Sequence, residues 1–278
     1  MSSLVVNNNL SALNAYNNVN QTDMAMSKAI SQLSSGLQIQ TAADNPAGYV
    51  TAEGLQSQAN GYTQAISNAQ NGVSLIQTAS GALNQVVSIL QTMNSLALAS
   101  ANGATNDSNS LNANQQEFTA LSNQIDQISQ TTQFGTTQLL NGSFSQQTLQ
   151  VGAFDTASNV ITLTIQGIST GALNIATTAV SVLNAASAQA AASAVQAAIS
   201  QVASIEAAVG ATQNQLNAVV ANLTVGQQNL QSAYSSIVDV NFAQATTTYS
   251  TDQILMQSGV AMLSQAQQTP SLVLKLLQ

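Results

Sequence analysis

The chain lacks both histidine and cysteine, and it has almost no cations. Its 278 residues hold two lysines, Lys28 and Lys275, and no arginine, against ten Asp and Glu, which gives a formal net charge of −8. Without cysteine there is no disulfide, no thiolate metal ligand and no cysteine nucleophile. Because histidine is missing as well, we expect no zinc site, and no metal or other cofactor is predicted.

The scarcity of cations also excludes whole classes of partner. Nucleic-acid binding needs clustered cations that displace condensed counterions, so no nucleic-acid partner is predicted. Asn, Gln or Ser interrupts every apolar run well before the roughly 20 residues that span a bilayer, so no membrane insertion is predicted. Residues 1–20 hold no cation and are rich in asparagine, unlike a secretory signal peptide. If the protein leaves the cell, another route must carry it.

What the sequence does contain is apolar spacing of three and four residues over long stretches. This spacing extends from Tyr62 to Asn102, from Leu111 to Ile128 and from Val195 to Ile237. It keeps one apolar stripe against a partner helix, as in a coiled coil. The first of these helices would be roughly 60 Å long. The break at 102–107 predicts a turn and therefore two antiparallel helices.

Shorter apolar patterns flank the long ones. A short helix is predicted to end before the Pro46 loop, because four apolar residues step by three or four: Met26, Ile30, Leu33 and Leu37. Another helix is predicted near the end of the chain, from Tyr249, Met256, Val260 and Leu263. After it, Thr269-Pro270 predicts that a turn restarts.

A strand is predicted between the helical blocks. Residues Val160 to Ile165 alternate between apolar and polar, and turn signals at Asn141-Gly142 and Gly167 flank them, so we expect one or two hairpins. The predicted fold class is therefore mainly α: a long antiparallel coiled-coil-like helical bundle with a small β-hairpin region, and with the N- and C-termini together at one end.

The ends of the chain are apolar, where most soluble domains fray into polar tails. Leu4, Val5, Leu10 and Leu13 lie near one end, and residues 272–277 are strongly apolar near the other. Identical terminal hairpins can cover each other, and a head-to-tail contact that does not close generates a helical filament. From periodicity alone, an ordinary soluble bundle fits equally well.

The ordered motifs favour the filament. Residues 33–39, 42–44 and 47–48 (LSSGLQI, AAD, AG) resemble the N-terminal signature of bacterial flagellins. Further segments resemble the family in the same order: Gln64-Ala65, Asn68-Ala69, 77–79, 81–83, 96–97 and 100–103, then 209–214, 222–223, 245–246, 253–255, Gly259 and 265–266. The resemblance covers roughly 145 N-terminal and 80 C-terminal residues, and such a series is more specific than one motif.

The resemblance implies a structural subunit that polymerises into the extracellular flagellar filament for motility, exported unfolded through the flagellar type III system. It implies that the protein is not an enzyme. Its implied partners are other copies of itself, the hook-associated junction and cap proteins, and a flagellin export chaperone. The alternative is a hook-associated junction protein, whose terminal helices are similar but whose central region is usually longer.

The resemblance also implies how the chain divides. An inner terminal-helix domain is expected from residues 1–42 and 241–278. A rod-like helical domain is expected from 43–142, a β-hairpin region at 143–184 and a long C-terminal helix at 185–240. Self-assembly is assigned to apolar residues of the terminal helices: Leu10, Leu13, Val19, Met26, Ile30, Leu33, Leu37, Ile254, Leu255, Met256, Leu263, Leu272, Leu274 and Leu277.

An enzyme made of this sequence would have to rely on carboxylates. Asp44, Glu53, Asp126 and Glu206 are scattered singly, which is typical of caps and solvated faces rather than of a catalytic pair. Asp44, two residues before Pro46, is interpreted as a turn-forming residue in preference to a subunit contact.

Residues 90–97 align with the family segment that an innate immune receptor recognises. That segment usually resembles Leu-Gln-Arg-x-Arg-Glu-Leu-Ala, whereas this chain reads Leu-Gln-Thr-Met-Asn-Ser-Leu-Ala. Leu96 is kept, and Glu117 resembles another acidic position of the receptor surface. Because both arginines and the glutamate are replaced, the resemblance predicts weak recognition.

The loss of cations extends through the whole chain, so we expect a global cause. In an acidic habitat carboxylates take up protons while lysine and arginine stay charged, and a cation-rich filament would repel itself. The alternative is an alkaline habitat, where more than ten carboxylates would be expected. The hypothesis of an acidic habitat is preferred.

Overall fold

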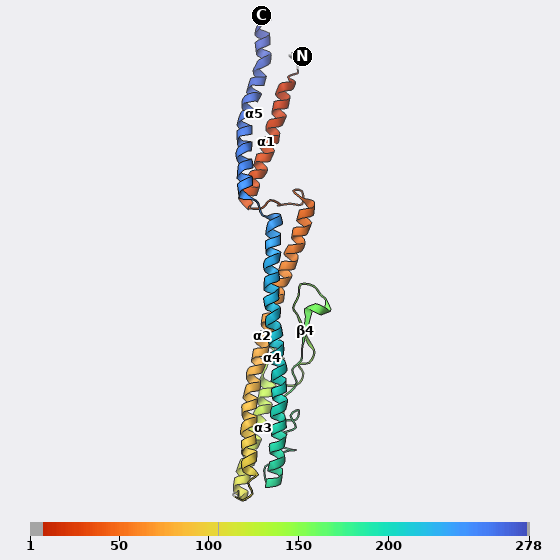
Figure 1. Ribbon diagram of the computed structural model, residues 1–278, viewed down its shortest axis with the longest axis vertical. Helices are drawn as coiled ribbons and strands as arrows, with labels where there is room; N and C mark the ends of the chain where they lie inside the picture. Colours follow the sequence, from red (N-terminus) through yellow and green to blue (C-terminus); the bar gives the residue numbers. More distant parts are fainter. Residues whose placement is uncertain (1–7, 105, 277–278) are drawn as a thin grey trace. The chain divides into compact units, whose positions relative to one another are not determined.

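The structure is a computed structural model that describes residues 8–104 and 106–276, with side chains described as far as residue 268. The described chain forms five α-helices: α1 (Leu10–Ser35), α2 (Pro46–Ser100), α3 (Ser108–Thr131), α4 (Ala185–Val238) and α5 (Phe242–Leu276). Four short strands and one 3-10 turn lie between α3 and α4 (Figure 1). The mainly α fold class predicted from the sequence is confirmed.

The chain divides into two compact units. The terminal unit contains residues 1–57 and 229–278, and the central unit contains residues 58–228. Both boundaries fall within the long helices α2 and α4. The functional domain limits expected at 42/43 and 240/241 stay a prediction.

The central unit is a bundle of α2, α3 and α4 around one apolar core (Figure 1). From Ala65 onward, the buried positions of α2 follow a four-three spacing: Ala65, Ala69, Gly72, Ile76, Ala79, Leu83, Val86, Leu90, Met93, Ala97 and Ser100. The three-four spacing predicts a stripe through Ile66, Ala69, Val73, Ile76, Ser80, Leu83, Val87, Leu90, Asn94, Ala97 and Ala101. This stripe agrees with the structure at every second position and lies one residue late at the others. Val73 and Val87 only flank the core, while Gly72 and Val86 enter it.

A similar shift occurs on α4, where the three-four spacing from Val195 to Ile237 places Glu206 on the predicted stripe. Val195, Val202, Val209 and Leu216 are buried as expected. Ile205 is also buried, so its neighbour Glu206 is only half-buried at the edge of the core. By length and hydropathy alone, α2 and α4 are long and apolar enough to cross a membrane. In the structure both helices line this core.

Two small hairpins pack beside the helices of the central unit. Strand β3 (Gln147–Gln150) pairs antiparallel with β4 (Val160–Leu163), with Leu149 opposite Ile161. The apolar alternation continues to Ile165, but the ladder ends at Leu163, where Gln146 N donates to the Thr164 side chain instead. A second hairpin, β1 (Gln133–Phe134) with β2 (Thr137–Gln138), turns at Gly135 with φ +62° and lies before the predicted hairpin region.

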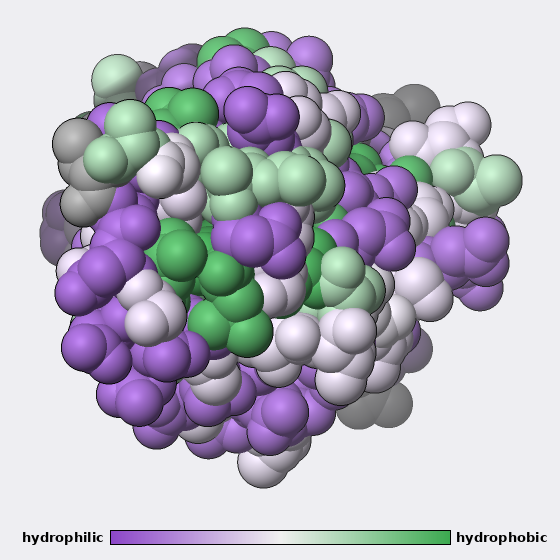
Figure 2. Space-filling view, turned by 90° about the horizontal axis from the view of Figure 1, so that it is seen from below, coloured by the Kyte–Doolittle hydropathy of each residue, from purple (hydrophilic) through white to green (hydrophobic). Residues whose placement is uncertain are grey.

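The loop between α2 and α3 is the predicted turn. Asp107 caps α3, with its carboxylate accepting from Ser110 N at 2.7 Å. Hydrogen bonds from the Ser110 side chain and from Ser110 N hold the pKa of Asp107 below its usual value. In the face shown in Figure 2, hydrophilic and intermediate residues surround a small hydrophobic group. Because the chain has few charges, uncharged polar side chains must supply most of this hydrophilicity.

Candidate assembly surface

Helices α1 and α5 of the terminal unit form an antiparallel pair, called the terminal hairpin below (Figure 1). At one end Val240 N donates to Gly36 O at 2.8 Å. Midway, a Cβ at Gly259 would lie 2.8 Å from Val19 Cγ2. At the other end Asn9 Nδ2 donates to Ala266 O at 2.6 Å. The start of α1 and the last part of α5 therefore lie together, as the predicted placement of the termini requires.

The terminal hairpin packs through a coiled-coil seam of mostly small residues. The least exposed positions of α1 step by three and four: Ala12, Ala15, Val19, Thr22, Met26, Ala29 and Leu33. On α5 they are Ala245, Tyr249, Asp252, Met256, Gly259, Leu263 and Ala266. Val260, predicted on this stripe, lies one residue off it and is exposed, because Gly259 occupies the seam where Val19 approaches.

The helices of the hairpin are longer than predicted. The first was expected only around Met26 to Leu37, but α1 begins at Leu10, because its asparagine-rich part packs on α5 through small residues. The helix ends at Ser35, and Gly36 follows as its C-cap with a left-handed φ of 76°. Gly36 N donates to Gln32 O. The turn predicted to restart at Thr269-Pro270 is wrong, since α5 continues to Leu276.

Asn9 explains how α5 tolerates Pro270. A proline has no N–H, so the carbonyl four residues earlier, that of Ala266, loses its usual helical donor. Asn9 Nδ2 donates to this carbonyl, while Asn9 Oδ1 accepts from Ala12 N at 3.0 Å and caps α1. One side chain therefore supplies a helix cap and a bridge to the partner helix.

The loop from Gly36 to Asn45 is held by Asp44. Its carboxylate accepts from Gln40 N at 3.3 Å and Thr41 N at 3.1 Å, and lies 2.8 Å from Lys28 Nζ on α1. The Lys28 ammonium and these backbone N–H groups lower the pKa of Asp44 from 3.8 to about 2. The turn-forming role inferred from the sequence is confirmed for this residue. Asn45 then caps α2 by accepting from Gly48 N, with Pro46 as the first helical residue.

The outward faces of the hairpin expose large apolar side chains. Leu10 is 66%, Leu13 54%, Ile254 63% and Leu255 52% exposed. Ile30, also predicted for self-assembly, is exposed as well, and so are residues that the sequence did not single out: Tyr16, Met24, Phe242 and Met262. The last four lie off the three-four stripes that guided the prediction, so spacing gave no signal for them.

The other predicted assembly residues have a different environment. Val19, Met26, Leu33, Leu37, Met256 and Leu263 are half-buried within the terminal unit. They therefore stabilise the hairpin itself as well as any contact with another chain. Leu272 and Leu274 belong to α5, but their side chains lie outside the described ones, and Leu277 lies outside the described residues.

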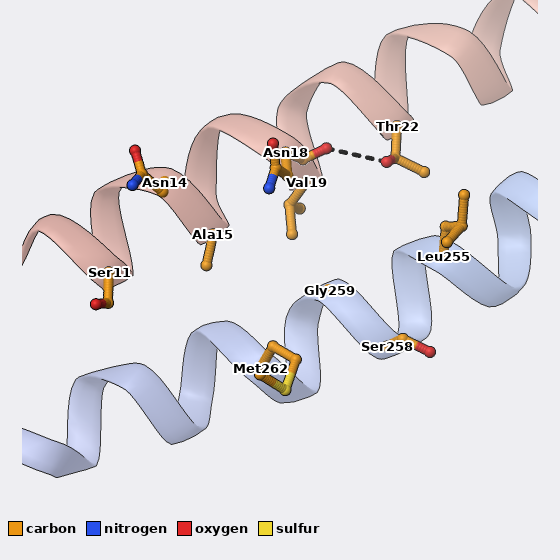
Figure 3. A pocket seen from close by; sticks show the side chains of 10 residues that line it. All are labelled: Ser11, Asn14, Ala15, Asn18, Val19, Thr22, Leu255, Ser258, Gly259 and Met262. Atoms are coloured by element: carbon orange, nitrogen blue, oxygen red, sulfur yellow. Dashed lines mark hydrogen bonds between the residues drawn. The ribbon is translucent and has the colours of Figure 1, made fainter.

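An open groove of about 420 Å³ lies along the hairpin (Figure 3). Figure 3 shows Ala15 and Val19 of α1 directed toward α5, and Gly259 and Met262 on the opposite wall. The lining is small, apolar or uncharged: Ser11, Asn14, Ala15, Asn18, Val19, Thr22, Leu255, Ser258, Gly259 and Met262. No lining residue can exchange a proton near neutral pH, so the groove suits an apolar side chain better than a reaction.

The carboxylates considered for catalysis are not brought together. Asp126 accepts from Thr170 N and Oγ1, both at 2.8 Å, and so fixes a loop to α3. Asp44 holds its own loop, and Glu53 and Glu206 lie on separate helices. Within residues 8–104 and 106–276 there is no group of three His, Cys, Asp or Glu side chains that could hold a metal. Leu96 is half-buried against the central core, and Glu117 is exposed on α3.

The terminal unit has a helical hairpin with apolar outer faces, and the central unit is a bundle with its own core and no lysine. Together these features define a structural protein whose activity is association. Contiguous exposed apolar surface in a soluble chain marks an interaction site. Proteins of similar sequence indicate the assembly in which this surface takes part.

Two family models match the chain: the bacterial flagellin N-terminal helical region over residues 6–145 and the C-terminal helical region over residues 192–277. A flagellin of Halalkalibacterium halodurans is 38% identical over 274 residues, covering 99% of this chain and 100% of the relative. A flagellin of Bacillus subtilis is 35% identical over 303 residues, covering 98% and 99%.

A solved structure of a putative flagellar hook-associated protein from Vibrio parahaemolyticus has a TM-score of 0.58 at 14% identity, covering 70% of this chain and 100% of that one. At this identity the likeness concerns the fold alone.

The chain belongs to the bacterial flagellin family. It is a structural subunit of the extracellular flagellar filament. The alternative of a hook-associated junction protein is less well supported, because the flagellins are 38% and 35% identical over nearly the whole of this chain. The hook-associated structure is 14% identical and covers 70% of it.

Proposed function

We propose that the terminal hairpin carries polymerisation, with the exposed apolar residues of one subunit covered by the hairpins of its neighbours. The observation that supports this proposal is the exposure of Leu10, Leu13, Ile254 and Leu255 on helices that bury little within the subunit. The groove along Val19 and Gly259 offers an uncharged recess for a neighbour's side chain.

In this proposal the inner terminal-helix domain comprises residues 1–42 and 241–278, and residues 43–240 form the outer shell. The chain leaves the cell unfolded through the flagellar type III system and has no catalytic activity. Besides other copies of itself, it contacts the hook-associated junction and cap proteins and an export chaperone. The neutral residues at 92–95 support weak recognition at the immune-receptor surface around Leu96 and Glu117.

The test replaces Leu10, Leu13, Ile254 and Leu255 together with glutamine. Because all four side chains are exposed, the soluble subunit should keep its helix content. Filament growth from seeds, followed by sedimentation and electron microscopy, should fall at least tenfold, since each lost apolar contact costs about 1 kcal/mol or more. The matched control carries Asn17→Gln and Gln253→Asn, exposed polar exchanges on the same two helices, and should polymerise normally.

Normal growth of the four-residue variant would contradict the proposal. An unaltered chain that forms only short rings at hook ends would favour the junction protein instead.

A further inference from the structure

The distribution of charge between the two units is unequal. The central unit holds five carboxylates and neither of the two lysines. Asp107, Glu117 and Asp155 are exposed, and Asp126 and Glu206 are half-buried. The fold of this unit therefore uses no ion pair with a side-chain cation.

The contacts that these carboxylates do make survive protonation in part. Asp107 accepts from a helix N-terminus, and Asp126 accepts from Thr170 N and Oγ1. A protonated carboxyl keeps an acceptor oxygen, so these bonds weaken in acid without an unpaired charge being left behind. The main stabilisation comes from a core of uncharged residues such as Phe118, Leu83 and Ile125, whose burial does not depend on pH.

Acid also lowers the magnitude of the net charge. Full protonation of the ten carboxylates takes the side-chain charge from −8 to +2, because only two lysines remain charged. In a protein with many lysines and arginines the same protonation leaves a large positive charge that opposes both folding and association. Here the repulsion between subunits decreases as the pH falls.

The described seam of the terminal hairpin also contains no cation. Its positions hold uncharged side chains apart from Asp252 on α5. We propose, resting on the filament function above, that this chain keeps its fold and its self-association in acid, because the contacts of its described residues hardly depend on cations.

The exception is the loop at Asp44, whose carboxylate has a pKa lowered to about 2 and therefore takes up a proton only as the pH falls toward that value. Lys28 of α1 is the charged group in contact with this carboxylate. The other titratable groups nearby in sequence or on adjoining elements are Tyr49 and Glu53 at the start of α2 and Asp239 after α4, and Asp239 accepts from the Ser235 hydroxyl. Protonation of Asp44 would leave Lys28 without its partner.

The test compares filaments of three chains, grown at about pH 7 and moved to about pH 3, where most carboxyls are neutral. One chain is unaltered. The second carries lysine at five exposed helix positions of the central unit, Thr92, Ser95, Asn123, Ser193 and Ser200, which raises the charge of the fully protonated chain from +2 to +7. The matched control carries glutamine at the same five positions.

The expected result is that the unaltered chain and the glutamine control stay pelletable at about pH 3, while the lysine chain loses at least about half of its pelletable material. Dissociation of the unaltered filaments as complete as that of the lysine chain would overturn the proposal and leave the filament function intact. If no chain forms filaments at about pH 7, the filament function fails. Thermal melts of the soluble chain then decide: cooperative melting retained at about pH 3 supports the proposal, and unfolding there overturns it.

Discussion

At the scale of single residues, side chains with two hydrogen-bonding groups hold the terminal unit together. Asn9 and Asp44 each contact two parts of the chain that are separate in sequence or in secondary structure. Neither contact follows from spacing. The sequence indicated a turn at Asp44, whereas the ion pair with Lys28 and the bond from Asn9 to Ala266 required the helices to be placed.

Two substitutions of Asn9 separate the effects of its two side-chain hydrogen bonds. Asn9→Asp keeps the acceptor for Ala12 N but has no donor for Ala266 O, whereas Asn9→Ala loses both. Hydrogen exchange should accelerate about fivefold in the last turns of α5 for both variants, since each lost bond is worth about 1 kcal/mol. It should accelerate at the start of α1 only for Asn9→Ala. If α5 in both variants exchanged at the rate of the unaltered chain, the bond to Ala266 would contribute nothing.

Asp44 should give the chain a defined pH dependence. Its pKa is lowered to about 2 from 3.8, so its carboxylate stabilises the folded state above about pH 4, and this stabilisation is lost as the pH falls toward 2. Asp44→Asn should therefore lower the melting temperature by a few degrees at pH 7 and by progressively less as the pH falls toward and below about 2. Thermal melts followed by circular dichroism measure this difference. Asp155→Asn, at an exposed carboxylate, is the control and should change the melting temperature little at pH 7.

At the scale of elements, glycines of α2 mark the positions where the β3 hairpin and its loop pack on the helix. A Cβ at Gly61 would lie 2.6 Å from Ala153 Cβ and 3.0 Å from Ala153 Cα, so the loop after β3 packs directly on the helix backbone. A Cβ at Gly72 would lie 2.5 Å from Leu149 Cδ2 on β3. The apolar pattern of α2 predicted a helix but gave no sign that its glycines receive the hairpin.

Two glycine substitutions in α2 should therefore act in opposite directions. Gly81→Ala meets no atom within 4 Å and should stabilise the chain by about 0.5–1 kcal/mol through helix propensity. Gly61→Ala gains the same propensity but pushes backbone atoms of the β3 loop, and should destabilise by about 1–2 kcal/mol. Denaturant unfolding of the soluble chain measures both. Stabilisation by both substitutions would mean that this loop does not pack on α2 in solution.

At the scale of the whole molecule, the two units differ in how much core each holds. In the central unit a continuous set of buried side chains extends over all three helices and the hairpin of β3 and β4. In α1 the buried residue is Ala29, and in the described part of α5 it is Ala245. Alone, the terminal hairpin is therefore expected to open readily, and contacts with other subunits should supply the missing burial.

Hydrogen exchange of soluble subunit and filament tests this difference. On polymerisation, amides of α1 and α5 should exchange at least about tenfold more slowly, because neighbouring subunits cover their apolar faces. Amides of residues 76–93 in α2, already within the central core, should change little. Full protection of α1 and α5 in the soluble subunit would contradict the assignment of polymerisation to the terminal hairpin.

The sequence by itself determined the helical class, the family and the lack of cations. Long apolar periods and composition are local or additive properties that need no coordinates, so the helices α2, α3 and α4 and the strand β4 were predictable. The tertiary structure decided which residue of each adjacent pair enters a seam, as for Gly72 against Val73 and Gly259 against Val260. It also decided that α5 passes through Pro270, because Asn9 from the other end of the chain donates to the Ala266 carbonyl. Such outcomes depend on how closely two backbones approach, and a one-dimensional pattern does not carry that distance.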